Sequence, residues 1–425
     1  MTSITLLLWI VSGILLQLVI YLSIVYWRHW KSYQALPTHG DTLNLNIAED
    51  EFNSIEEGNS TERLEFHALR VDRKVVENIS GSICSFYLKP EHGKPLPSFL
   101  PGQFLTFRLD IPIAPGSIQR VIRCYSLSDA PCADYYRITI KREPPGTSRD
   151  AGLGLASQYF HDHVNVGSIL QVRAPCGHFH SDNSENPIVL IGGGIGITPL
   201  LSMLNQCSQQ QPTREIWLFY GLRDGRETVM KSHLEGLASS NPNFHLHICM
   251  SHPLPEDELD RDYQHPGRVD IELLRTQLPD KPYHFYICGP TSMLESLVSA
   301  LEDWGIDETQ IHFEAFGPAS IKRRHAKTAV TEAQDDPAIN GSIVVNFAQS
   351  GLQFQWQPFD SNLLAFAEAK GVSVNAGCRA GSCGSCQTKL ISGEVEYHQP
   401  PDYDPEQGSC LLCVCIPKTN ITLQA

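Results

Sequence analysis

Residues 187–206 read PIVLIGGGIGITPLLSMLNQ: a nearly apolar run, a glycine-rich turn and then an apolar helical pattern. The run 187–191 has no charged residue, which is typical of a strand buried on both faces of a parallel sheet. The glycines of 192–196 let the backbone approach a pyrophosphate, and the amides at the start of the next helix attract an anion. The stretch therefore predicts a doubly wound α/β domain with a dinucleotide site at the turn.

The residues after this turn continue the alternation of strands and helices that such a sheet requires. The expected strands are 215–220, 245–250 and 283–288, and the expected helices lie near 227–237 and from 270 onwards. The sequence leaves open whether the adenosine ribose of the dinucleotide carries a 2′-phosphate, as in NADPH, or a free diol, as in NADH. Arg223 and Arg226 could hold a 2′-phosphate, whereas Asp224 could instead bind a ribose diol.

The segment before the turn, 66–181, is rich in short β-like runs separated by proline and glycine. These runs are 69–76, 82–88, 104–109, 136–141 and 169–172. Short strands at this spacing predict an antiparallel barrel. The sequence Arg123-Cys124-Tyr125-Ser126 lies within this segment.

Arg123 to Ser126 resembles the R-x-Y-S flavin motif of the ferredoxin–NADP reductase superfamily, and the glycine turn resembles the G-x-G-x-x-P form found there. The likeness is strongest to the reductase half of flavohaemoglobins, which bind FAD, and it covers roughly Phe66 to Pro318. Five further segments match in order: Pro101-Gly102-Gln103-Phe104, Gly154 to Ser157 with the helix after it, Ala174 to Phe179, Cys288-Gly289-Pro290, and His312 to Pro318.

The resemblance implies a role for each matching residue. Tyr125, Ser126 and Cys288 would be catalytic: Tyr125 lies against the flavin ring, Ser126 bonds its reactive nitrogen, and Cys288 orients the nicotinamide. Arg123 would hold the flavin phosphate through its guanidinium fork, and Phe316 would cover the other ring face. The expected cofactor-binding residues are Phe104, Arg123, Cys124, Tyr125, Ser126, Gly154, Ser157, Gly193, Gly194, Ile195, Gly196, Ile197, Thr198, Pro199, Cys288, Gly289, Pro290, Glu314, Phe316 and Gly317.

Near the C-terminus, Cys378, Cys383 and Cys386 form C-x4-C-x2-C, the spacing of plant-type 2Fe–2S ligands. The small residues between them let the backbone wrap closely and donate N–H groups to sulfur. Three later cysteines, at 410, 413 and 415, compete for the fourth position. The string 412–417 resembles the L-x-C-x-C-x-P ending of reductase-fused ferredoxins, which implies that Cys413 ligates. A zinc site would require a second cysteine pair, and disulfides do not suit a reducing compartment.

The N-terminal segment 4–27 contains no charged side chain. As a helix it would extend ~36 Å, enough to cross a hydrocarbon core of ~30 Å. Because Arg28, His29 and Lys31 follow at once, the sequence predicts a single-pass anchor with the remaining chain on the cytoplasmic side. A cleaved signal peptide would require a basic residue before the apolar segment, and Met1 to Ser3 have none.

The chain has 425 residues, enough for about three domains of ~150 residues. The expected fold is multidomain, α+β and α/β. The predicted parts are a transmembrane anchor (4–27), an acidic linker (28–63), an antiparallel FAD-binding β-barrel (64–184), a doubly wound NAD(P)-binding domain (185–318), a linker (319–340) and a 2Fe–2S ferredoxin domain of β-grasp fold (341–425). The net charge of −15 argues against a nucleic-acid partner.

We therefore expect a membrane-anchored reductase that passes electrons from NAD(P)H through FAD and a 2Fe–2S cluster, one at a time, to a separate acceptor protein. The acceptor could be an oxygenase, a hydroxylase, a haem protein or a hybrid-cluster protein, and the anchor suggests that it is membrane-bound. One alternative is a membrane-tethered redox sensor or scaffold with little turnover. Another is a flavin reductase whose ferredoxin domain is vestigial.

Overall fold

The computed structural model of the chain describes residues 65–91, 95–143, 153–182, 184–316, 343–357, 362–379, 381, 383–398, 401 and 403–425. All of them belong to the second of two compact units, Thr61–Ala425. The predicted anchor 4–27, both predicted linkers (28–63 and 319–340) and the predicted site residue Gly317 lie outside the described residues.

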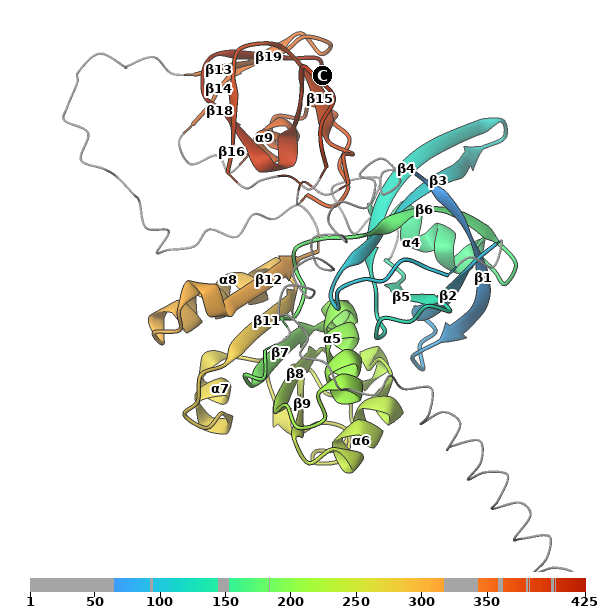
Figure 1. Ribbon diagram of the computed structural model, residues 1–425, viewed down its shortest axis with the longest axis vertical. Coiled ribbons are helices and arrows are strands. Elements are labelled where there is room, and N and C mark those ends of the chain that lie inside the picture. The colour runs from blue at the N-terminus through green and yellow to red at the C-terminus, as the bar shows by residue number, and fades with distance from the viewer. Residues whose placement is uncertain are drawn as a thin grey trace, which may run out of the picture. The chain divides into compact units, whose positions relative to one another are not determined.

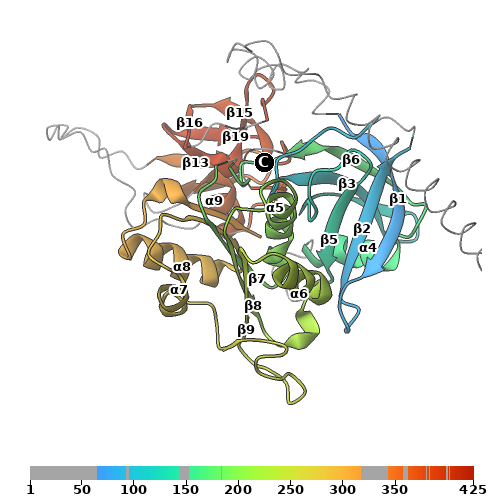
Figure 2. The same ribbon diagram turned by 60° about the horizontal axis from the view of Figure 1, so that its bottom comes forward.

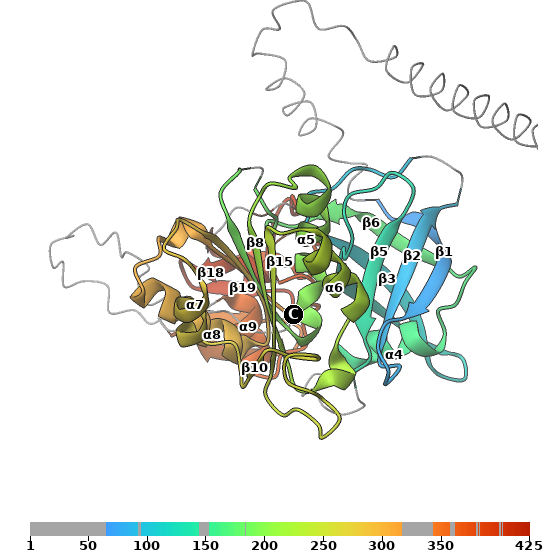
Figure 3. The same cartoon turned by 90° about the horizontal axis from the view of Figure 1, so that it is seen from below.

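The first described region is a six-stranded antiparallel sheet, seen with its helix in Figure 3. The strand order is β4-β3-β6-β1-β2-β5, and the elements are β1 (His67–Val76), β2 (Ile83–Pro90), β3 (Phe104–Ala114), β4 (Ser117–Ser126), β5 (Tyr136–Lys141), β6 (Ile169–Cys176) and helix α4 (Leu153–Asp162). Phe160 of α4 packs its ring 5.3 Å from Phe86 and 5.4 Å from Phe107, which anchors the helix in the core.

This sheet is a half-barrel, whereas the sequence predicts an antiparallel barrel. Within the described residues, one isolated bridge, Leu127 to Ile138, links the end of β4 to β5. Strand β4, which carries the flavin motif, does not stand out in the sequence as a strand. It lies at the edge of the sheet, and its first four residues are exposed, so the hydrophobic alternation of a half-buried strand is missing.

The second region is a six-stranded parallel sheet covered by helices on both faces. Its strand order is β10-β9-β8-β7-β11-β12, with β7 (Ile188–Gly193), β8 (Ile216–Leu222), β9 (Phe244–Met250), β10 (His265–Pro266), β11 (His284–Gly289) and β12 (Ile311–Ala315). Helices α5 (Ile197–Gln210) and α6 (Lys231–Ser240) lie on one face, and α7 (Ile271–Gln277) and α8 (Thr291–Asp303) lie on the other, as Figure 2 shows.

This arrangement confirms the doubly wound fold. From β7 the chain adds β8 and β9 on one side and later returns to place β11 on the other side, so the order reverses between β7 and β11. Ligands of such sheets bind at this switch point, outside the carboxyl ends of the strands. All six residues of β7 are buried, in agreement with the apolar run that predicted it.

The third region is a small mixed sheet that curves around one helix, α9 (Leu363–Ala369), as Figure 1 shows. Its strand order is β14-β13-β19-β15-β17, with β13 (Val344–Phe347), β14 (Leu352–Gln355), β15 (Gln387–Ser392), β17 (Ser409–Leu411) and β19 (Ile421–Leu423), beside a two-stranded sheet of β16 (Val395–Tyr397) and β18 (Cys415–Pro417). The Phe366 ring of α9 stacks 6.4 Å from Phe347, in a core that also contains Cys386 and Cys413.

The predicted localisation, a single-pass membrane protein, is contradicted. None of the helices in the described part of the chain is long and apolar enough to cross a membrane. The longest, α5, has 14 residues. At 1.5 Å per residue it reaches only ~21 Å, against the ~30 Å of a hydrocarbon core.

Candidate functional site

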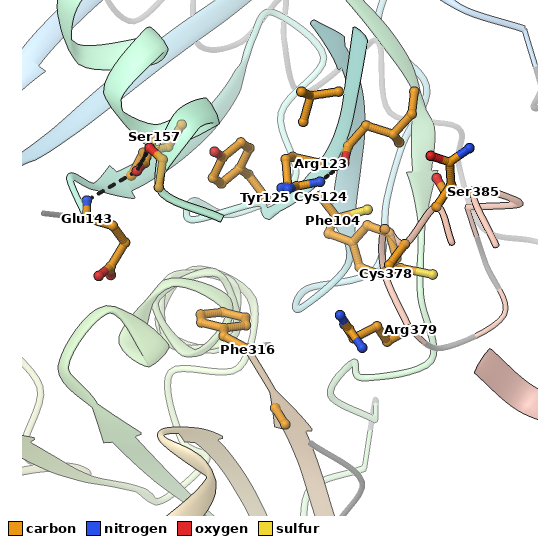
Figure 4. A pocket seen from close by; sticks show the side chains of 18 of the residues that line it. Phe104, Arg123, Cys124, Tyr125, Glu143, Ser157, Phe316, Cys378, Arg379 and Ser385 are labelled. Atoms are coloured by element: carbon orange, nitrogen blue, oxygen red, sulfur yellow. Dashed lines mark hydrogen bonds between the residues drawn. The ribbon is translucent and has the colours of Figure 1, made fainter. Parts of the chain in front are cut away.

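A pocket of about 1060 Å³ brings together residues from all three described regions. Figure 4 shows Tyr125 and Phe104 from the half-barrel, Phe316 just after β12, and Cys378 and Arg379 from the cysteine loop around one space. The predicted site residues that line it are Phe104, Arg123, Cys124, Tyr125, Ser126, Gly154, Ser157, Ile195, Thr198, Glu314, Phe316 and Cys378.

The pairing of β3 with β4 joins two of the predicted flavin motifs. Phe104 lies opposite Ser126, and Leu105 lies opposite Tyr125. Gly177 makes room for the Phe104 ring, since a Cβ at this glycine would lie 2.8 Å from Phe104 Cε1. The aromatic residue of P-G-Q-F and the hydroxyl of R-x-Y-S therefore reach the pocket side by side.

Tyr125 is held by other aromatic rings. Its ring lies 5.7 Å from Phe107 and 5.2 Å from Phe160, both in edge-on packing. Burial raises the pKa of Tyr125, so the phenol stays neutral at physiological pH. Arg123 lines the same pocket and donates from Nη1 to the carbonyl oxygen of Ile122 at 2.7 Å.

The first turn of α4 forms another part of the pocket wall. The Ser157 hydroxyl donates to the Gly154 carbonyl at 3.0 Å and accepts from the Glu143 backbone N–H at 3.2 Å. These bonds tie the segment after β5 to the start of the helix. The N-terminal amides of a helix favour an anion, and Gly154 lines the pocket there.

The glycine turn after β7 packs on the C-G-P segment after β11. A Cβ on Gly196 would lie 2.2 Å from the Cys288 carbonyl oxygen, and one on Gly193 would lie 2.7 Å from Pro290 Cδ. Gly289 is equally close, since its own Cβ would lie 3.0 Å from Gly193 Cα. The two predicted motifs thus form one surface at the switch point, which only glycine permits.

The remaining predicted residues of the turn divide into two groups. Ile197 and Pro199 are buried in the first turn of α5 and fix the helix to the sheet. Ile195 and Thr198 line the pocket, and the Thr198 hydroxyl donates to the Ile195 carbonyl at 3.0 Å. Gly194 has φ +55° with open space around its α-carbon, so here the need for glycine is conformational.

Cys288 and Glu314 are neighbours on paired strands at the carboxyl edge of the sheet. Burial raises the pKa of the fully buried Cys288 thiol. It also raises the pKa of Glu314 to about 8, and Glu314 Oε2 has no hydrogen-bond partner among the described residues. Phe316, two residues further on, is 41% exposed at the pocket.

The segment after β8 answers part of what the sequence left open about the coenzyme. Asp224 is buried, and both oxygens of its carboxylate accept from Arg226: Nε to Oδ1 at 2.9 Å and Nη2 to Oδ2 at 2.8 Å. This hydrogen bonding lowers the pKa of Asp224. The carboxylate is therefore engaged in the loop itself, while Arg223 and Arg226 are exposed.

The four predicted cluster ligands lie in two pairs. The sulfur atoms of Cys386 and Cys413 are 3.2 Å apart. Cys378 and Cys383 are joined by the Cys378 N–H to Cys383 Sγ bond at 3.1 Å and the reverse bond at 3.3 Å. Cys410 and Cys415 instead bond to each other. No group of three metal-binding side chains suited to a single ion occurs in the described part of the chain.

Two pairs of thiols fit a cluster in which each of two irons takes two thiolates. Within the loop, a Cβ on Gly377 would lie 2.5 Å from Cys383 Sγ, so the backbone here approaches the sulfur as closely as glycine allows. The residues present therefore suit a 2Fe–2S cluster.

Three residues near this loop hold it to its surroundings, and two of them, Arg379 and Arg173, do not emerge from sequence reasoning. Arg379, between two ligands, forms a bidentate pair with Glu368 of α9 at 2.7 and 2.8 Å. The Cys124 thiol of the flavin motif bonds to Cys383, which is the largest effect lowering the pKa of Cys383. Arg173 of β6 donates to the Cys383 carbonyl oxygen. Of the two residues that were missed, only Arg379 carries a sequence signal, its place inside C-x4-C.

Family models match three successive parts of the chain. The oxidoreductase FAD-binding domain matches residues 70–181, the oxidoreductase NAD-binding domain matches 190–299, and the 2Fe–2S iron–sulfur cluster binding domain matches 345–418. This order agrees with the three described regions. The chain belongs to the ferredoxin–NADP reductase type of flavoprotein, with a 2Fe–2S domain attached.

Similar proteins cover the reductase to different extents. A flavohaemoprotein of Halalkalibacterium halodurans is 41% identical over 256 residues, 60% of this chain and 61% of that protein. The flavohaem-like FAD/NAD-binding domain of nitric oxide dioxygenase from Vibrio cholerae is 30% identical over 60% of this chain and 100% of its own, with a TM-score of 0.52. Phthalate dioxygenase reductase is 27% identical over 85% of this chain and 98% of its own, with a TM-score of 0.50.

The reductase thus combines a flavohaemoprotein-like half with a ferredoxin domain, and it spans 61% of the length of the first of these relatives. Its domains are those of an NAD(P)H oxidoreductase, with FAD and a 2Fe–2S cluster as cofactors. The predicted family resemblance, enzyme class and cofactors are confirmed to this extent. The membrane anchor receives no support from these findings.

Proposed function

We propose that the reductase takes electrons in pairs from NAD(P)H and delivers them one at a time to a separate acceptor protein. The observation that carries the proposal is the shared pocket: Tyr125 of the flavin motif, Phe316 beside the nicotinamide segment, and Cys378 of the cluster loop line one space. A flavin there would have its hydride donor and its electron acceptor on adjacent sides.

The domain boundaries remain part of the proposal: an FAD-binding domain at 64–184, an NAD(P)-binding domain at 185–318 and a β-grasp ferredoxin domain at 341–425. The mixed sheet around α9 supports the β-grasp assignment, since its first strand pairs in parallel with the last, β19, and antiparallel with β14.

FAD, when bound, accepts a hydride and releases its two electrons singly. The role we assign to Arg123 is to hold the flavin phosphate by charge-assisted hydrogen bonds. The Tyr125 ring, fixed by Phe107 and Phe160, would support one face of the flavin, and the Ser126 hydroxyl would donate to its reactive nitrogen. Exposed Phe316 would cover the other face and move aside for nicotinamide.

At the nicotinamide end, the turn 193–196 would bind the pyrophosphate through its backbone and the start of α5. The Cys288 thiol, neutral because of burial, would hold the ring in a space that excludes water. Glu314, whose pKa is about 8, would keep its carboxyl proton at neutral pH and donate a hydrogen bond toward the reacting rings.

The exposed guanidinium group of Arg223 favours NADPH at the coenzyme site. Asp224, the carboxylate that the sequence offered for a ribose diol, is occupied by Arg226. Both coenzymes must be measured, because the pyrophosphate turn is common to the two.

The class of acceptor protein is inferred from the 2Fe–2S cluster, from which the electrons would leave this chain. Cys378, Cys383, Cys386 and Cys413 would hold the cluster, a carrier of single electrons. Phthalate dioxygenase reductase, which covers 85% of this chain, is described as transferring electrons from pyridine nucleotides to 2Fe–2S. This likeness favours an oxygenase or hydroxylase as the acceptor over a haem or hybrid-cluster protein.

The test compares the wild type with Cys383→Ser in two steady-state assays, using NADPH and NADH in turn. Ferricyanide, which takes electrons from flavin, should be reduced by both proteins, whereas cytochrome c should be reduced quickly only by the wild type. Negligible activity with both oxidants would favour a redox sensor or scaffold. Unchanged cytochrome c reduction in Cys383→Ser would favour a flavin reductase with a vestigial ferredoxin domain.

A further inference from the structure

Arg173, on strand β6 of the half-barrel, reaches across to the cluster loop of the ferredoxin domain. Its Nη1 donates a hydrogen bond of 2.5 Å to the carbonyl oxygen of Cys383, a predicted cluster ligand 210 residues away in the sequence. This bond is long-range and ends on the backbone of the loop. A change in the side chain at 383 would therefore leave its acceptor in place.

Two aromatic rings hold the Arg173 guanidinium in position. Its central carbon lies 4.6 Å from the Phe66 ring of the half-barrel and 5.6 Å from the Tyr403 ring of the ferredoxin domain. Both distances are within the ~6 Å range of a cation–π contact, and a planar guanidinium can stack on two rings at once. Arg173 Nε is buried and has no hydrogen-bond partner among the described residues, so this nitrogen is shielded from water.

Tyr403 connects this contact to the cluster loop. A Cβ on Gly384, the residue after Cys383, would lie 2.4 Å from Tyr403 Cε2, so the ring lies directly on the loop backbone. The ring thus touches Arg173 on one side and the ligand loop on another. Arg173 thereby contacts the loop twice, once by its hydrogen bond and once through Tyr403.

On the half-barrel side, the same strands lead to the flavin motif. Arg173 lies opposite Thr106 of β3, and Thr106 lies opposite Cys124 of β4. The Thr106 hydroxyl and the Cys124 sulfur are 3.5 Å apart. Cys124, between Arg123 and Tyr125, bonds to Cys383 from this side. The half-barrel therefore contacts Cys383 twice: Arg173 bonds to the carbonyl oxygen of Cys383, and Cys124 bonds to its sulfur.

We propose that Arg173 is a positioning residue that docks the cluster loop on the flavin half-barrel and so sets the rate of electron transfer from flavin to cluster. The inference rests on the proposed function, because it concerns the path between the two cofactors. One electron leaves the reduced flavin and enters the oxidised cluster, with no bond made or broken in the cluster loop. Arg173 keeps the separation short and constant.

The test uses the holoprotein with Arg173→Met, which keeps an unbranched apolar stem but removes the guanidinium group with its charge and hydrogen bonds. Arg108→Met is the matched control. Arg108 also stacks on Phe66, at 4.5 Å, and none of the described hydrogen bonds or ring contacts joins it to residues 343–425. Iron and flavin content are measured first, so that both variants are compared at equal loading.

Anaerobic stopped-flow should show flavin reduction by NADPH within about twofold of the wild type in both variants. The rate of electron transfer from flavin to cluster should fall at least severalfold in Arg173→Met alone, because this rate decreases steeply as the separation of donor and acceptor grows. Arg173→Lys should restore little of the electron-transfer rate, because an ammonium group cannot stack on rings and donate hydrogen bonds as a planar fork.

A second readout is independent of turnover. Small-angle scattering of the oxidised holoprotein should give a larger radius of gyration for Arg173→Met than for the wild type or Arg108→Met. If Arg173→Met is poorly folded, Tyr403→Leu should produce the same pair of changes from the ferredoxin side. Unchanged transfer with an unchanged radius, or equal losses in Arg108→Met, would overturn the proposal. A wild type whose cluster is never reduced would instead overturn the proposed function.

Discussion

The reductase contains two loops rich in glycine that receive a cofactor, and they are held in different ways. The turn at 192–199 is fixed by the protein: it follows the fully buried strand β7, and Gly196 packs against the Cys288 carbonyl. In the cluster loop, the described residues 378, 379, 381 and 383–386 form no helix or strand, and the Cys386 sulfur lies 3.2 Å from the sulfur of Cys413, which lies outside the loop.

The difference shows which parts of the site the chain completes alone. The strand before the dinucleotide turn, β7, buries apolar side chains on both faces of the sheet, so the geometry of the turn follows from folding. The cluster loop brings thiols together in a small core, where metal binding supplies part of the folding free energy. We therefore expect the first loop to tolerate loss of its ligand and the second to depend on iron.

The largest effect is expected at the metal ligands. Cys386→Ala should abolish the 2Fe–2S signal and lower the thermal stability of the ferredoxin domain, because one iron loses a thiolate and the loop loses its bound metal. Iron analysis, electron paramagnetic resonance after dithionite, and calorimetry measure these changes. Cys415→Ala is the control, because it also removes a buried thiol from this core. The Cys415 thiol bonds to Cys410, and neither belongs to the proposed ligand set.

The two variants also test the ligand assignment. Cys415→Ala should retain full iron content with at most a modest loss of stability. If Cys415→Ala loses the cluster and Cys413→Ala keeps it, the assignment of Cys413 as the fourth ligand is wrong.

The next largest effect is expected from Gly196→Ala. The new Cβ would lie 2.2 Å from the Cys288 carbonyl oxygen, so the turn and the C-G-P segment must move apart. A shift of about 1 Å at such a site can cost ~100-fold, and we expect the KM for NADPH to rise by that order. Steady-state ferricyanide reduction measures it.

Gly236→Ala is the matched control, since a Cβ at this position in α6 meets nothing within 4 Å. This control should leave KM unchanged and stabilise the helix by ~1 kcal/mol. Equal KM values for Gly196→Ala and wild type would mean that the turn adjusts freely and that the proposed contrast between the two loops is incorrect.

A smaller, pH-dependent effect is expected from Glu314→Gln. Burial raises the pKa of Glu314 from 4.5 to about 8, so the folded protein retains a proton that the unfolded chain releases between these values. Its contribution to stability is complete below pH 4.5 and is lost as the pH rises through 8. Allowing for the partial exposure of Glu314, we expect the free energy of unfolding to be about 1–2 kcal/mol lower at pH 9 than at pH 6.

Glu314→Gln removes this proton and should reduce the difference in thermal unfolding temperature between pH 6 and pH 9. The comparison is made on protein free of flavin and coenzyme, so that only the chain titrates. An identical pH dependence in the variant and the wild type would mean that Glu314 is ionised at neutral pH.

The parts predicted from sequence were those with strong local patterns. The apolar run before the glycines predicted β7, and the C-x4-C-x2-C spacing predicted the cysteine loop. Strand β4 was missed because its first four residues are exposed on both faces of the sheet, so no hydrophobic alternation marks it in the sequence. Arg173 could not be found, since its contact with Cys383 depends on how two domains pack. The predicted membrane localisation was wrong for the described chain, where no helix exceeds 14 residues.

The central claim is that electrons pass from NAD(P)H to flavin and then to the cluster within this one chain. Anaerobic stopped-flow mixing with NADPH or NADH, with samples frozen at set times for paramagnetic resonance, tests it directly. The account predicts that flavin absorbance is lost first and that the reduced-cluster signal then rises at a rate fast enough to support turnover. A flavin that is fully reduced while the cluster stays oxidised would contradict it.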